Sequence, residues 1–229
     1  MKKLFLAILS IIMVQGAMAQ IVPAEDPIGT LYTYEVQAAG VKLDQEIKLI
    51  ENNGDSFKVE IKQDMPNNLG VLNYTCNYII QGGMLIQPLA EMQKLLEEQM
   101  SKLGASGTSV SLDGEPLHIP LNGNIGDEFP LNKYTTTVSA MGFSQNVDIQ
   151  TVSNKIIGQE TITVPAGTFE TIVVEAKGES TVSAMGQTKS GEVLYKFWII
   201  PGRGVAKSSI DEGVGGQTIQ VLKSITRPE

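Results

Sequence analysis

The sequence predicts a mainly β protein: a curved antiparallel sheet, or an incomplete β-barrel, with one amphipathic helix packed across it. Short runs rich in β-branched and aromatic residues follow one another from Leu31 to Ile225, and Gly, Asn and Asp separate them. One stretch, Pro88 to Leu103, instead spaces its apolar residues as a helix does. About ten strands with turn signals at this spacing are typical of a sheet that curls, a sandwich or a barrel.

The predicted strands share β-branched and aromatic residues and end at turn signals. They are Leu31–Ala39, Val41–Glu51, Ser56–Gln63, Val71–Gln81, Tyr134–Ala140, Gln145–Val152, Glu160–Val164, Glu170–Lys177, Ser180–Ala184, Val193–Ile200, Val205–Ile210 and Gln217–Ile225. Turns are expected at Asn52–Asp55, Asp113–Pro116 and Pro165–Gly167. This order of strands and turns indicates an antiparallel meander.

A V-x-A-x-G pattern occurs three times, at Val36–Gly40, Val138–Gly142 and Val182–Gly186. Each copy predicts a strand that ends in a glycine turn and returns as the next strand, because glycine readily adopts positive φ. If the tips Ala140-Met141 and Ala184-Met185 end neighbouring hairpins, we expect a small apolar rim there, suited to docking a lipid or a protein partner.

The segment from Pro88 to Leu103, closed by Gly104, is predicted to be an amphipathic helix. Pro88 near its start and Gly104 after its end match the preference of helices for an early proline and a terminal glycine. Its apolar residues share one stripe: Leu89, Met92, Leu95, Leu96, Met100 and Leu103. The helix either covers one face or open end of the sheet, or acts as a movable lid over an apolar cavity.

The first nineteen residues have the pattern of a cleavable secretory signal peptide. A basic start at Lys2 and Lys3 precedes an apolar run and the small-residue exit Ala17-Met18-Ala19. The apolar run is shorter than the roughly 18 to 20 residues that span a bilayer. We therefore expect cleavage after Ala19, a periplasmic or secreted protein without a lipid anchor, and a single β-rich domain over residues 20–229.

The charge of the chain argues against nucleic acid as a partner. The whole chain has a formal charge of −8, and removal of Lys2 and Lys3 with the signal peptide makes it −10. A phosphate backbone would repel such a protein on average.

The sequence contains no complete set of catalytic or metal-binding residues. Cys76 is the one cysteine and falls on the apolar side of an alternating strand, so it predicts a buried thiol rather than a nucleophile. His118 is the one histidine, and no nucleophile motif lies near it. One His with one Cys does not make the usual zinc sets. We expect no catalytic residues, no metal and no cofactor, and therefore no enzyme.

The most distinctive stretches are Gly158–Glu170, with Val164-Pro165-Ala166-Gly167-Thr168-Phe169 inside it, and Phe197–Lys207, with Trp198 and Pro201-Gly202-Arg203-Gly204. Together they resemble the TapB-like group of uncharacterised exported bacterial β proteins. The resemblance implies an exported, sheet-dominated fold, distantly reminiscent of the half-barrels of periplasmic lipoprotein carriers. It implies no activity.

The leading hypothesis for function is an envelope protein that binds a hydrophobic ligand, such as a lipid or acyl chain, between the concave sheet and the helix. The expected ligand-binding residues are Leu89, Met92, Leu95, Leu96, Met100 and Trp198. Trp198 has two interpretations, an anchor in the core or a stacking surface for the ligand. The alternative function is a non-catalytic structural or protein-interaction module with a filled core and an envelope protein as its partner.

Overall fold

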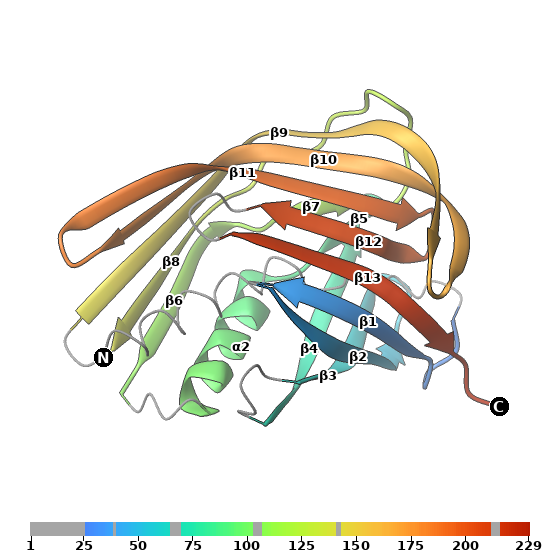
Figure 1. Cartoon of the computed structure of the whole chain (residues 1–229), viewed down its shortest axis with the longest axis horizontal. Helices are drawn as coiled ribbons and strands as arrows, with labels where there is room; N and C mark the ends of the chain where they lie inside the picture. Colours follow the sequence, from blue (N-terminus) through green and yellow to red (C-terminus); the bar gives the residue numbers. More distant parts are fainter. Residues whose placement is uncertain (1–25, 39, 65–69, 103–106, 141–142, 212–215) are drawn as a thin grey trace.

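A computed structural model describes residues 26–229 except 39, 65–69, 103–106, 141–142 and 212–215. The predicted signal peptide lies outside the described residues. The described strands form one antiparallel sheet, and one described helix packs against it (Figure 1). The strands are β1 (Leu31–Ala38), β2 (Val41–Asn52), β3 (Ser56–Asp64), β4 (Val71–Gln81), β5 (Met84–Ile86), β6 (Ser109–Glu115), β7 (His118–Pro120), β8 (Lys133–Ala140), β9 (Phe143–Val164), β10 (Gly167–Ala184), β11 (Gln187–Ile200), β12 (Gly204–Asp211) and β13 (Gln217–Thr226), and the helix is α2 (Leu89–Lys102).

The sheet curls strongly and stays open. Its 13 strands follow the order β6-β8-β9-β10-β11-β12-β13-β1-β2-β3-β4-β5-β7, so β6 and β7 are its two ends. These two strands are nevertheless consecutive in the chain, with only Pro116 and Leu117 between them. No ladder joins β6 to β7 in the described part of the chain. The predicted fold class, a curved antiparallel sheet or incomplete barrel with one helix across it, is confirmed.

The predicted hairpins are present where the structure describes them. Ala38 pairs with Val41 around Gly40, whose φ is +78°, and Ala184 pairs with Gln187 around Met185 and Gly186. The two-residue loop of the second hairpin has positive φ at both positions, which matches the twist of the flanking strands. Met185 is exposed. Met141, the other half of the expected apolar rim, lies outside the described residues.

Several predicted boundaries are wrong. The predicted strands Gln145–Val152 and Glu160–Val164 are parts of one strand, β9, and Glu170–Lys177 and Ser180–Ala184 are parts of β10. Sequence analysis missed β5, β6 and β7 altogether.

The predicted turn Asp113–Pro116 is also wrong, because Asp113, Gly114 and Glu115 belong to β6. A Cβ on Gly114 would lie 2.1 Å from the backbone oxygen of Lys133 in β8. The glycine therefore permits a close approach of two strands rather than a reversal of the chain.

The long strand β9 has different neighbours along its two halves. Its first half pairs with β8. Residues 151–156, in the middle of the strand, lie beside residues 126–132, and the N–H of Phe129 donates to the backbone oxygen of Asn154 at 2.9 Å. The side-chain amide of Asn154 donates to the backbone oxygens of His118 (2.9 Å) and Pro130 (3.1 Å). This amide thus ties β9, the third strand from the β6 end, to the β7 end of the sheet.

The core lies on the concave side of the sheet. Residues that alternate along the strands meet there in one large buried cluster, which includes Tyr34, Phe57, Tyr78, Phe197 and Ile199. The rings of Phe57 and Tyr78 stack with centroids 5.2 Å apart. A smaller cluster lies between α2 and the β6–β8 pair.

Candidate functional site

The helix α2 covers a gap between two strand edges. Residues 71–78 of β4 pair with β3 on one side only, and β6 pairs only with β8, within the described chain. Helix α2 contacts both β4 and β6 (Figure 1). We call this gap, between the edge of β4 that faces away from β3 and the edge of β6 that faces away from β8, the seam. A helix across it covers edges that would otherwise expose unpaired backbone groups.

Two side chains of α2 take the place of ladder hydrogen bonds in the seam. The carboxylate of Glu91 accepts from the backbone N–H of Asn77 at 3.1 Å and from its side-chain amide at 2.9 Å. On the other edge, the side-chain oxygen of Gln93 accepts from the backbone N–H of Leu112 at 3.4 Å. The helix is therefore fastened to both edges by side chains rather than by a backbone ladder.

The apolar stripe of α2 divides into two parts. Leu95 belongs to the large core cluster, while Leu96 and Met100 pack with Val110 and Val138 in the smaller one; all three helix residues are at most 3% exposed. Leu89 and Met92 are only half-buried and belong to neither cluster. Leu103 lies outside the described residues.

Trp198 does not join the helix residues. It alternates along β11 with Phe197 and Ile199, which are core residues, so its indole lies on the opposite, outer face of the sheet. Its Nε1–H donates to Glu160 at 2.7 Å. The Nζ atoms of Lys196 and Lys207 each lie 4.6 Å from the centre of its ring. The structure thus brings five of the six expected ligand-binding residues onto one helix and separates the sixth.

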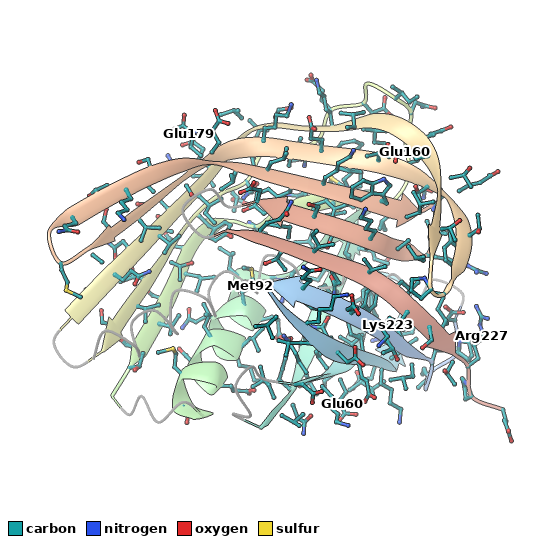
Figure 2. The ribbon with its side chains drawn as sticks, in the orientation of Figure 1. Glu60, Met92, Glu160, Glu179, Lys223 and Arg227 are labelled. Atoms are coloured by element: carbon teal, nitrogen blue, oxygen red, sulfur yellow. The ribbon has the colours of Figure 1, made fainter. Side chains whose placement is uncertain are left out.

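Glu160, Lys196 and Lys207 form a group around Trp198 that sequence analysis missed. Figure 2 shows Glu160 on the outer side of the upper strands. The sequence does contain a signal for this group, since Glu160 lies in the distinctive stretch Gly158–Glu170, and Trp198 and Lys207 lie in the distinctive stretch Phe197–Lys207. Beside them is a surface hollow of about 300 Å³ lined by Gln159, Glu160, Thr161, Glu170, Thr171, Ile172 and Pro201.

A row of polar side chains crosses the concave face, and sequence analysis missed it too. The side-chain amide of Gln220 in β13 donates to Gln45 in β2 at 2.7 Å, and that of Gln45 donates to Gln63 in β3 at 3.2 Å. Ser208 in β12 pairs directly with Gln220. We call Gln63, Gln45, Gln220 and Ser208 the polar row. The sequence signal for the row is the period-two alternation of the strand. Gln45 lies two residues before Ile47 and therefore points to the same, buried face of β2.

The polar row ends in two buried atoms that lack partners. Gln220 is 0% exposed and Ser208 is 2% exposed. The side-chain oxygen of Gln220 and the hydroxyl oxygen of Ser208 form no hydrogen bond within the described residues. Buried polar atoms without a hydrogen-bond partner are rare in folded proteins, so these two atoms are candidates for binding a group from outside the chain.

Cys76 is a buried free thiol, as predicted. Burial raises its pKa to about 12, against a smaller lowering by the amide of Gln87, which donates to the sulfur at 3.3 Å. A thiol with such a pKa is not a nucleophile at neutral pH. His118 is half-buried at the β7 end of the sheet.

No group of three or more His, Cys, Asp or Glu side chains among the described residues is placed to hold a metal ion. No helix in the described part of the chain is long and apolar enough to cross a membrane.

A curled, open antiparallel sheet with a helix across its seam defines the class of this protein. Residues 30–210 match the family described as DUF3108-like, and the chain belongs to that family. No curated protein matches the sequence. The predicted kinship with exported bacterial β proteins is supported at the level of fold, while the TapB-like name stays a prediction.

Two solved structures are similar to the chain. An exported-protein candidate with a YmcC-like fold from Bacteroides fragilis has a TM-score of 0.56 and 16% identity, covering 91% of this chain and 100% of its own. A lipoprotein candidate from Parabacteroides distasonis has a TM-score of 0.56 and 15% identity, covering 88% of this chain and 96% of its own. The fold is therefore YmcC-like.

Proposed function

We propose that the protein is a non-enzymatic envelope protein that binds a hydrophobic ligand, such as a lipid or acyl chain, between the concave sheet and α2. The two similar structures support the export part of this proposal, since one is named for export and the other as a lipoprotein. The tripartite start of the sequence supports cleavage after Ala19 and release into the periplasm or medium.

The seam is the observation that carries the ligand-binding part. Elsewhere the described wall is held by backbone ladders, whereas α2 is held to its edges through Glu91 and Gln93. Each such bond contributes about 0.5–1.5 kcal/mol to stability, or up to about 3 where a charged group takes part. The helix is therefore joined to the two strand edges without a backbone ladder, and the packed residues Leu95, Leu96 and Met100 of its apolar stripe face the interior.

Leu89 and Met92 are the helix residues best suited to meet a ligand. They are half-buried and lie outside both buried clusters, so their replacement leaves the packed core intact. By contrast, Leu95, Leu96 and Met100 are packed in the core, and truncating such residues costs about 2–5 kcal/mol of stability. Polar variants at those three positions would confuse unfolding with loss of binding.

The test is a titration of the mature protein with N-phenyl-1-naphthylamine, a neutral apolar fluorophore. We expect saturable uptake, and about a tenfold weaker Kd in the double variant Leu89→Ser, Met92→Ser, because about 1.4 kcal/mol of apolar contact is lost. Ala90→Ser, at an exposed position of the same helix, is the matched control and should bind as the original does. No uptake, or equal Kd values in all three proteins at equal melting temperature, contradicts the proposal.

An exposed apolar ridge favours a second candidate, a protein-interaction module. Ile125, Leu131, Val152 and Ile157 are 63%, 50%, 65% and 37% exposed. They lie in or next to the contact between residues 126–132 and residues 151–156 of β9. Exposed apolar groups that gather in this way are typical of protein contacts.

The interaction candidate predicts a stoichiometric protein partner in the envelope of the host. The partner should be lost from the double variant Leu131→Ser, Val152→Ser, and should remain with Ile79→Ser, an exposed apolar position on β4. Retention of the partner by the double variant would count against the ridge.

A further inference from the structure

The polar row lies on the same face of the sheet as the core. Residues that pair directly across two strands share a face. Ser208 pairs with Phe197, and Gln63 pairs with Leu72, and both of these partners belong to the core cluster. The row therefore faces the interior, where the proposed function places the ligand.

The described chain buries hydrogen-bonding groups but no charged side chain. Its buried polar residues, wherever they lie in the fold, are all neutral amides and hydroxyls: Thr30, Gln45, Gln63, Gln87, Asn132, Thr136, Gln145, Thr151, Asn154, Thr171, Ser180, Ser208, Thr218 and Gln220. A carboxylate, phosphate or ammonium buried among such groups would have no opposite charge beside it. Burial of an unpaired charge is far more costly than burial of a hydrogen-bonded neutral group.

The free end of the row has a definite chemistry. The amide nitrogen of Gln220 already donates to Gln45, so its unpartnered oxygen needs a donor. The hydroxyl of Ser208 beside it both donates and accepts. A hydroxyl or an amide on a ligand satisfies both atoms, whereas an ionised carboxylate has no proton to give to Gln220.

We propose that the ligand is a neutral amphiphile, an apolar chain with a hydroxyl or amide group that hydrogen-bonds Gln220 and Ser208 at the end of the polar row. This inference rests on the proposed function and adds the class of ligand to it. The polar row binds the polar group of the ligand. The interior excludes ligands that have the same chain length but a charged head group.

The test compares four probes with one chain length by native mass spectrometry of the mature protein: 1-dodecanol, dodecanamide, dodecanoate and dodecyl phosphate. We expect the two neutral probes to bind at least about tenfold more tightly than the two anions, since one to two hydrogen bonds separate them. The same titrations are run with Ser208→Ala and with Ser209→Ala. Ser209 is the next residue of β12 and is half-exposed on the other face, so it is the matched control.

Ser208→Ala should weaken 1-dodecanol binding by about three- to tenfold, the loss of one hydrogen bond, and Ser209→Ala should leave it unchanged. The hydroxyl of Ser208 has no partner to lose within the described chain, so the folded protein should be as stable as before. Equal affinity for neutral and anionic probes, or no effect of Ser208→Ala, overturns the neutral-ligand inference and leaves the proposed function standing. Failure of all four probes to bind overturns the proposed function itself.

Discussion

At the scale of the residue, glycine positions show how little room separates the long strands. A Cβ on Gly178 in β10 would lie 2.1 Å from the backbone oxygen of Gln150 in β9, while a Cβ on Gly158 in β9 would meet nothing within 4 Å. Both residues lie inside strands at ordinary backbone angles. Gly178 therefore marks a close approach of two backbones, next to a register shift between β9 and β10.

These two glycines make a matched pair for measurement. We expect Gly178→Ala to lower the free energy of unfolding by about 1–3 kcal/mol, because the added methyl group forces β9 and β10 apart. Gly158→Ala should stay within about 1 kcal/mol of the original protein, since alanine fits and restricts the unfolded chain. Urea denaturation of both variants checks this, and equal stabilities would contradict the close approach at Gly178.

Residue-scale patterns predicted the strands better than the polar row. Period-two alternation correctly placed Cys76 on a buried face. The same parity puts Gln45 in phase with Ile47, and Gln220 in phase with Leu222, yet glutamine ordinarily indicates an exposed position. The burial of these amides depends on partners about 175 residues apart in the chain, which a local pattern does not contain.

At the scale of the element, α2 was predictable and its place was not. Helical spacing and the proline-first, glycine-last pattern fixed its existence, and Leu89–Lys102 falls within the predicted range. Its position in the seam depends on where β5 and β7 lie in the sheet. Each of these strands has three residues, which is too short for an alternating pattern to reveal it in the sequence. The long strands β9 and β10 were predicted in pieces because strand glycines resemble chain breaks.

The fastening of α2 predicts a pattern of hydrogen exchange. Replacing Glu91 or Gln93 by Ala should speed exchange of the Asn77 or Leu112 amide, respectively, by about tenfold, because each amide loses its acceptor. Lys94→Ala, at an exposed position of the same helix, is the control. Unchanged exchange at both amides in both variants would mean that these bonds do not hold the helix to its edges.

At the scale of the whole molecule, hydrogen bonds join the segment that precedes the first strand, β1, to the segment that follows the last strand, β13. Asp26, before β1, accepts from Tyr32 at 2.5 Å and from Arg227, after β13, at 2.9 Å. Burial by itself would raise the pKa of Asp26, but the hydrogen bonds from Tyr32 and Arg227 outweigh it and lower that pKa below 3.8. Figure 2 shows Arg227 at the C-terminal end of the sheet.

This tie predicts a specific loss of stability in acid. The folded protein holds the ionised Asp26 more strongly than the unfolded chain does, so its contribution is complete above pH 3.8 and is lost as the pH falls below that value. Asp26→Asn should therefore lower stability at neutral pH and flatten the fall below pH 3.8. Asp113→Asn, at an exposed position of β6, is the control. The measurement is the free energy of unfolding from urea denaturation at each pH. If this free energy falls identically in Asp26→Asn and in the original protein, the proposed role of Asp26 is contradicted.

We propose that the curled sheet and α2 enclose a hydrophobic ligand. The measurement that tests it most directly is native mass spectrometry of the mature protein, purified gently from its own host, followed by organic extraction. We expect one apolar, uncharged molecule per chain, with lower occupancy in the double variant Leu89→Ser, Met92→Ser. A mass equal to the bare polypeptide, together with no uptake of added apolar probes, would contradict the claim.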